Sequence, residues 1–145
     1  MKKKAFTLIE MLLVIAIIGL LGTITIPFYQ RLQITTQRQT FSNQLISELR
    51  HAKLMAISAN NDQSWGLNIN QNQATLFMGN DFANRDQTFD ESVVVPSNVT
   101  VGGSINQVIF AKQSGLPNVS GIITVSDTNG QTQSIAINSQ GTVDY

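Results

Sequence analysis

Residues 1–22 read MKKKAFTLIEMLLVIAIIGLLG, and this stretch decides how the chain is organised. Lysines at positions 2 to 4 precede a run from Phe6 to Phe28 whose polar members are Thr7, Glu10, Thr23 and Thr25. A helix of about 23 residues spans about 35 Å, enough for a hydrocarbon core of about 30 Å. Because the lysines flank one end only, that end is expected in the cytoplasm and the rest of the chain across the membrane.

Three interpretations of this segment compete. A cleaved secretory signal has the same basic start, but the apolar run is too long and no small-residue cleavage site follows it. A plain membrane anchor leaves Glu10 unexplained, since a carboxylate costs about 2.5–3.5 kcal/mol at the membrane centre and less near a helix end. The third interpretation accounts for the lysines, the apolar run and the carboxylate together.

Residues 4–21, KAFTLIEMLLVIAIIGLL, resemble the type III signal of type IV pilins and pseudopilins. The resemblance implies that a prepilin peptidase cuts on the cytoplasmic side, between Ala5 and Phe6, and that Phe6 is then N-methylated. Glu10 becomes the fifth mature residue, where the family has its glutamate, and Pro27 falls where pilins often have a helix-loosening proline. Ala5 departs from the pattern, because the family usually has glycine before the cut.

The position of Glu10 suggests a role in assembly. After cleavage, the new ammonium group of one subunit can lie beside Glu10 of its neighbour in a helical filament. Two charges that are each costly in an apolar medium become less costly as a pair. We therefore expect this pair to set the axial register between subunits.

The helix is expected to continue beyond the apolar run to about residue 59. Pro27 removes one backbone donor, which predicts a kink near it. Asn60-Asn61 is a plausible stop. The segment between them is amphipathic, with one apolar stripe at helical spacing that predicts packing on a sheet. The stripe consists of Ile34, Phe41, Leu45, Leu49, Ala52 and Ala56.

After residue 62 the hydrophobic period changes to two, which predicts β-strands. The connections are short and Asp127 to Gly130 reads DTNG, a strong hairpin signal, so antiparallel pairing is expected. The expected fold is α+β, a long N-terminal helix packed on a C-terminal antiparallel sheet domain. The candidate strands are residues 64–70, 74–79, 93–95, 98–101, 107–111, 121–126, 133–138 and 141–145.

The expected organisation has four parts. Residues 1–5 form the leader, and 6–28 form a transmembrane or filament-core helix. Residues 29–61 continue that helix into the globular domain, and 62–145 form the β domain.

Two further stretches are similar to minor pilins of the GspH/FimT family. They are ELRHAKLMAISAN, residues 48–60, and IFAKQSGLPNVSGIITVSDTNGQTQSIAINSQGTV, residues 109–143. The resemblance implies a minor pseudopilin of the type II protein secretion system. The alternative is a FimT/FimU-type minor pilin of a type IV pilus, acting in pilus assembly, DNA uptake or adhesion. Either role implies the bacterial inner membrane, a periplasmic C-terminal domain, and other pilins and an assembly platform as partners.

Nucleic acid is not expected as a partner. In some FimT-type pilins an arginine-rich C-terminal tail is associated with DNA binding, whereas this chain ends in GTVDY and has no arginine after Arg85. A phosphate-binding surface needs clustered cations.

Residue types offer little catalytic chemistry. The chain has no cysteine, which excludes disulfides, thiolate nucleophiles and cysteine-bearing zinc sites. His51, its one histidine, is expected to be a surface or sheet-packing residue. Asp127 and Asn129 fit a turn better than a calcium loop, since the glycine and glutamate of an EF-hand are missing. We expect no catalytic residue, metal or cofactor; a membrane-anchored periplasmic enzyme is the alternative of another class.

Residues 80–92, NDFANRDQTFDES, fit either a solvated loop or a docking surface for another subunit. Exposed aromatic residues serve as interface anchors. Phe82, Phe89 and Asp86 are therefore the candidate partner contacts.

Overall fold

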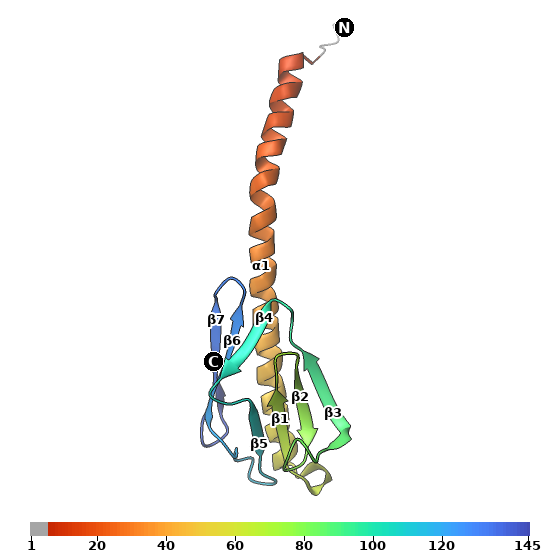
Figure 1. Ribbon diagram of the computed structural model, residues 1–145, viewed down its shortest axis with the longest axis vertical. Coiled ribbons are helices and arrows are strands. Elements are labelled where there is room, and N and C mark those ends of the chain that lie inside the picture. Colours follow the sequence, from red (N-terminus) through yellow and green to blue (C-terminus); the bar gives the residue numbers. More distant parts are fainter. Residues whose placement is uncertain (1–5) are drawn as a thin grey trace. The chain divides into compact units, whose positions relative to one another are not determined.

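The computed structural model describes residues 6–145, except for the side chains of residues 24–27. The chain divides into two compact units, Met1–Gln33 and Ile34–Tyr145. One long helix, α1 (Leu8–Ile57), contributes residues to both units (Figure 1). A long N-terminal helix packed on antiparallel sheets is the predicted α+β fold, which is confirmed.

The N-terminal part of α1 exposes a long run of apolar side chains. From Phe6 to Leu21 its large apolar residues are all solvent-exposed, Leu8 by 80%. Within the described residues, α1 is the one helix long and apolar enough to cross a membrane, with a mean hydropathy of 2.5 in its most apolar window. Helical backbone continues through Pro27, whose side chain lies outside the described residues, so the kink there stays a prediction.

Residues in the left-handed conformation follow the end of α1. The helix stops at Ile57, close to the predicted stop, and a short 3-10 turn, η1 (Asn60–Asp62), follows. Ala59, Asn61 and Asp62 have φ angles of 49°, 54° and 58°, a left-handed conformation that asparagine and aspartate tolerate better than alanine. The chain thereby reverses direction and enters the first strand.

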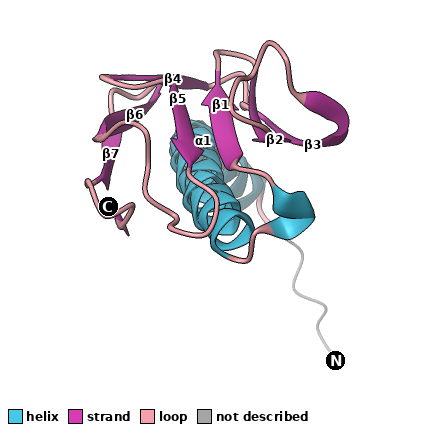
Figure 2. Cartoon of the chain, turned by 90° about the horizontal axis from the view of Figure 1, so that it is seen from below, coloured by secondary structure: helices cyan, strands magenta, loops and turns pink. Residues whose placement is uncertain are grey.

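The described part of the second unit contains two four-stranded antiparallel sheets. The first sheet consists, in spatial order, of β3 (Asp86–Val94), β2 (Gln73–Met78), β1 (Trp65–Ile69) and β5 (Gln107–Phe110). The second consists of β4 (Val99–Gly103), β6 (Gly121–Asp127), β7 (Thr132–Ile137) and β8 (Val143–Asp144). Figure 2, which looks along α1, shows the strands arching over one side of the helix, with β3 at one end and β7 near the other.

One strand is much longer than the sequence pattern predicts. β3 begins at Asp86, whereas only residues 93–95 were expected to be extended. It pairs with β2 from Gln73↔Val94 to Leu76↔Glu91, and the register shifts before Met78↔Asp86. The loop interpretation of residues 80–92 is therefore wrong for its second half. β3 is an edge strand, so backbone pairing with β2 forms it although its side chains are mostly polar.

The core lies between α1 and both sheets. Five of the six predicted stripe residues are at most 1% exposed, and Ile34 is half-buried. The buried stripe residues form one core cluster with inward-facing residues of both sheets. These include Leu67, Leu76, Val108, Ile123 and Ile135. Burying one such side chain contributes about 1.5–3 kcal/mol, so the stripe is what holds two separate sheets on one helix.

A buried ion pair fixes the β6–β7 hairpin to α1. Nε of Arg38 donates to Oδ2 of Asp127 at 3.1 Å, and the Asp127 side chain is fully buried. The other carboxylate oxygen of Asp127 accepts from the backbone N–H groups of Asn129 and Gln131 at 2.9 and 3.0 Å. The predicted turn is present, and the carboxylate that caps it is engaged by an arginine.

Two more helix cations bind the C-terminal segment. Nζ of Lys53 donates to the carbonyls of Gln140 and Gly141, at 2.8 and 3.0 Å, and Nη2 of Arg50 donates to the carbonyl of Val143 at 3.3 Å. The short strand β8 is thereby fastened to α1.

Candidate assembly segment and docking edge

The start of α1 is capped by a side chain of the predicted signal. Thr7 directly precedes the helix, and its Oγ1 accepts from the backbone N–H of Glu10 at 3.3 Å. Threonine followed three residues later by glutamate is the capping-box pattern, in which side chains satisfy free N–H groups of the first turn. In FTLIE, the Thr7 side chain thus also helps to start the helix, a local role that the sequence analysis did not assign although the spacing was readable.

The residues predicted for processing and assembly lie at this end. Phe6 and Glu10 are exposed, and none of the described residues forms an ion pair with Glu10. Ala5 lies outside the described residues, so the cut between Ala5 and Phe6 stays a prediction. Further along α1, Oγ1 of Thr23 donates to the carbonyl of Leu20 at 2.8 Å.

The predicted docking residues are distributed over the outer edge of the first sheet. Phe89 is 40% exposed, and its ring meets Trp65 edge to face at 6.3 Å between centroids. Phe82 is half-buried, edge to face on Phe77 at 5.2 Å. Asp86 is exposed. Phe82 therefore serves mainly internal packing, whereas Phe89 and Asp86 remain accessible.

Arg85 links the segment before β3 to the strand itself through several side-chain contacts. Its guanidinium lies 3.7 Å from the centre of the Phe82 ring, and its Nη1 donates to the Phe82 carbonyl at 2.8 Å. Nη2 and Nε of Arg85 also bind the carboxylate of Asp90, at 2.8 Å for the closest pair. Next to it, hydrogen bonds from the Thr88 hydroxyl and backbone hold the pKa of Asp86 below its usual range. This edge is a folded, charged surface.

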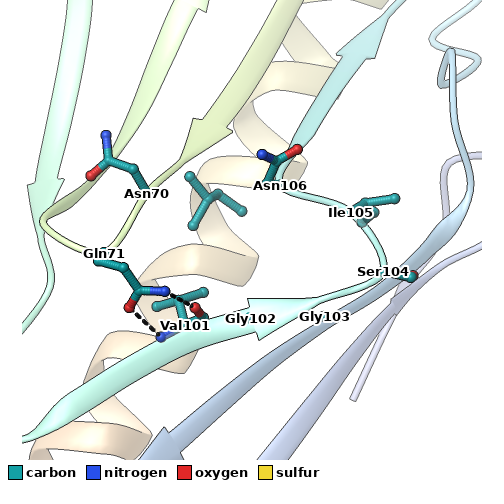
Figure 3. A pocket seen from close by; sticks show the side chains of 9 residues that line it. Asn70, Gln71, Val101, Gly102, Gly103, Ser104, Ile105 and Asn106 are labelled. Carbon is teal, nitrogen blue, oxygen red and sulfur yellow. Dashed lines mark hydrogen bonds between the residues drawn. The ribbon is translucent and has the colours of Figure 1, made fainter.

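A pocket of about 530 Å³ lies where β4 leaves the second sheet toward β5 (Figure 3). The side-chain amide of Gln71 pairs with both backbone groups of Val101, as a neighbouring strand would. The residues that line the pocket carry no ionisable side chain, so it offers no group for acid–base catalysis. They are Ile69, Asn70, Gln71 and Val101 to Asn106.

The structure also assembles a group that the sequence analysis missed. Glu48 and His51 of α1 and Glu91 of β3 have ligand atoms that all lie within 4.8 Å of one another. Burial raises the pKa of the Glu48 carboxyl, His51 lowers it, and Glu91 raises it. His51, expected to be a surface or sheet-packing residue, is partly buried, and a ring nitrogen lies near the carboxylates of Glu48 and of Glu91, which is 40 positions away in the sequence.

Taken together, these features define a pilin-like fold: a capped apolar N-terminal helix whose amphipathic continuation packs on antiparallel sheets. Residues 1–26 match a family model described as the prokaryotic N-terminal methylation motif. No curated protein matches the sequence.

Among solved structures, the chain is similar to the minor pseudopilin EpsH from the Type 2 Secretion System of Vibrio cholerae. The TM-score is 0.55 at 10% sequence identity, and the match covers 77% of this chain and 94% of the EpsH chain. The fold is therefore that of a minor pseudopilin, and the N-terminus carries a pilin-type methylation motif.

Proposed function

We propose that this chain is a minor pseudopilin, a structural subunit of a short filament related to type IV pili. One combination carries the proposal: a methylation motif at residues 1–26 on a chain whose fold is that of EpsH. Its role is mechanical and recognitional. The pocket is lined by residues without an ionisable side chain, and the described titratable groups along β3 are not arranged as a nucleophile, base and oxyanion site.

The maturation that we propose begins with a cut between Ala5 and Phe6 by a prepilin peptidase, followed by methylation of the Phe6 amine. Residues 6–28 then hold the subunit in the inner membrane, with residues 62–145 in the periplasm, until an assembly platform inserts it into the filament. The exposed apolar side chains of the first unit support this proposal, because they need either lipid or neighbouring helices to cover them.

In the filament, the ammonium of one subunit pairs with Glu10 of the next. The absence of an ion pair to Glu10 among the described residues of one chain leaves its carboxylate available for a neighbour. Thr7 complicates a simple test, since replacing Glu10 can also weaken the helix cap. Glutamine keeps the capping ability of the side chain and removes its charge.

The test is therefore a pair of variants, Glu10→Gln and Glu10→Ala, with Thr7→Ala as the capping control. If the charge pair governs assembly, both Glu10 variants insert into the membrane normally and fall at least about tenfold in sheared filaments, the cost of roughly 1.4 kcal/mol. Thr7→Ala retains most of its incorporation. Normal incorporation of Glu10→Gln would show that the charge is not used.

Of the two systems, we favour type II secretion over a type IV pilus. EpsH is described as a type II secretion subunit. In addition, three of the five cations from residue 34 onward are paired with carboxylates, and the other two donate to backbone carbonyls, so few charges remain for a phosphate backbone. These cations are Arg38, Arg50, Lys53, Arg85 and Lys112.

Deleting the gene separates the two roles. Loss of exoprotein release with normal twitching and transformation supports secretion, and the opposite pattern supports the pilus.

We also propose that Phe89 and Asp86 of the β3 edge contact a partner subunit. Phe89→Ser should then reduce co-purification of neighbouring subunits; unchanged co-purification would remove Phe89 from the interface.

A further inference from the structure

The cluster of Glu48, His51 and Glu91 joins two elements that have no sequence proximity. Glu48 and His51 are spaced i and i+3, which places them on one face of α1. Glu91 is directly opposite Leu76 in the β2–β3 pairing, and Leu76 is fully buried in the core. Because residues paired across a sheet point to the same side, Glu91 projects from the edge strand toward the helix.

One oxygen of this cluster is buried without a partner. Oε2 of Glu48 is inaccessible and accepts no hydrogen bond from any described residue. A buried carboxylate oxygen without a donor is costly, and native proteins normally satisfy such atoms. The neighbouring Glu91 adds negative charge instead of a donor. His51 offsets part of the cost of burying the Glu48 carboxylate, but no described residue donates a hydrogen bond to its Oε2 atom.

The types and spacing of the ligands select the cation. Two carboxylates and one imidazole are a set that zinc accepts, whereas calcium and magnesium prefer oxygen alone. Tetrahedral zinc with bonds of about 2.0–2.1 Å holds its ligand atoms about 3.4 Å apart. Since the three ligand atoms already lie within 4.8 Å, side-chain rotations can close the site. Glu91 is exposed, so a water molecule can reach the fourth position.

We propose that Glu48, His51 and Glu91 form a zinc-binding site that ties the edge strand β3 to α1. Three protein ligands and one solvent position make it an accessible site. Its structural effect is to fix β3, which carries the candidate docking residues Phe89 and Asp86. Zinc would thus order the surface on which we place the partner contact.

The test uses the full-length chain in detergent, stripped of metal with a chelator and titrated with zinc chloride alone. We expect the melting temperature to rise by several degrees and to saturate at one zinc per chain. His51→Gln and Glu91→Gln should each weaken binding at least about tenfold, since even outer-shell changes cost that much. Asp144→Asn, an exposed carboxylate on β8, is the matched control and should bind as the unchanged chain does.

Cobalt provides a second readout that does not depend on stability. Co²⁺ bound in place of zinc should give a visible absorption band of four-coordinate geometry, lost in His51→Gln. A chain that shows no saturable melting shift with zinc contradicts the proposal. So does a His51→Gln chain that retains the wild-type shift and the wild-type cobalt spectrum.

Discussion

At the scale of single residues, the described carboxylates of the globular unit have different roles according to their surroundings. Asp127 is buried and receives an arginine and two backbone donors. Asp90 is partly exposed and holds the segment before β3 through Arg85. Glu48 has one buried oxygen and no donor for it. Because of these differences, disrupting the Glu48 carboxylate and disrupting the ion pair of Asp127 are predicted to change the free energy of unfolding in opposite directions.

Removing the charge of Glu48 should stabilise the metal-free protein. A raised pKa means that the folded state holds the proton more tightly than the unfolded state. The ionised form therefore destabilises the fold above the ordinary pKa of 4.5, and this penalty disappears as the pH falls below it. His51 on α1 and Glu91 on β3 are the charged groups that act on it.

In chelator, Glu48→Gln should raise the free energy of unfolding near pH 7 by less than about 1 kcal/mol, because solvent screens a carboxyl that is only partly buried. The gain should shrink near pH 4, where the wild-type carboxyl is largely protonated. Chemical denaturation at both pH values measures it. A loss of stability near pH 7 would mean that the Glu48 carboxylate has a donor in solution.

Breaking the Arg38–Asp127 pair should have the opposite sign. Arg38→Met leaves a buried carboxylate without its cation and should lower the free energy of unfolding by about 3–5 kcal/mol. Arg38→Met combined with Asp127→Asn should cost less than the sum of the two single changes, since the groups contact each other. Simple additivity in a denaturation cycle would show that the pair is not coupled.

At the scale of elements, α1 is one helix with two kinds of surface. From Ile34 to Ile57 it buries a stripe against the sheets and leaves the opposite face to solvent. Leu45 is 1% exposed and Leu54 is 64% exposed, although both are leucines of the same helix. The apolar stripe, and not helix propensity alone, is what stabilises this half of α1.

The two leucines give a matched comparison. Leu45→Ala should lower the free energy of unfolding by about 2–5 kcal/mol, because it removes a packed side chain and leaves a cavity. Leu54→Ala should change it by less than about 0.5 kcal/mol. Thermal or chemical unfolding distinguishes them, and equal effects would place the packed face of α1 elsewhere.

The same scale shows what the sequence could predict. Strands with alternating apolar residues, such as β1 and β6, were readable because one face is buried. The first half of β3 was not, since an edge strand with polar side chains has no periodic signal and is formed by backbone pairing. The division into two sheets and the Glu48–His51–Glu91 cluster were not readable either, because both depend on contacts between distant segments.

At the scale of the whole molecule, two units with different surfaces share one chain. The first unit, Met1–Gln33, carries the methylation motif within residues 1–26 and exposes apolar side chains. The second, Ile34–Tyr145, has its own core and the edge strand β3, which carries the candidate docking residues. This division fits the proposed role, in which one unit is held by lipid or by neighbouring helices and the other meets partners.

The most direct test of that role is the mass of the N-terminal peptide in protein isolated from assembled filaments. The account predicts a chain that begins at Phe6 and carries one added methyl group on its amine. Filaments whose subunits still begin at Met1 would contradict it, because the amine that is needed beside Glu10 would then not exist.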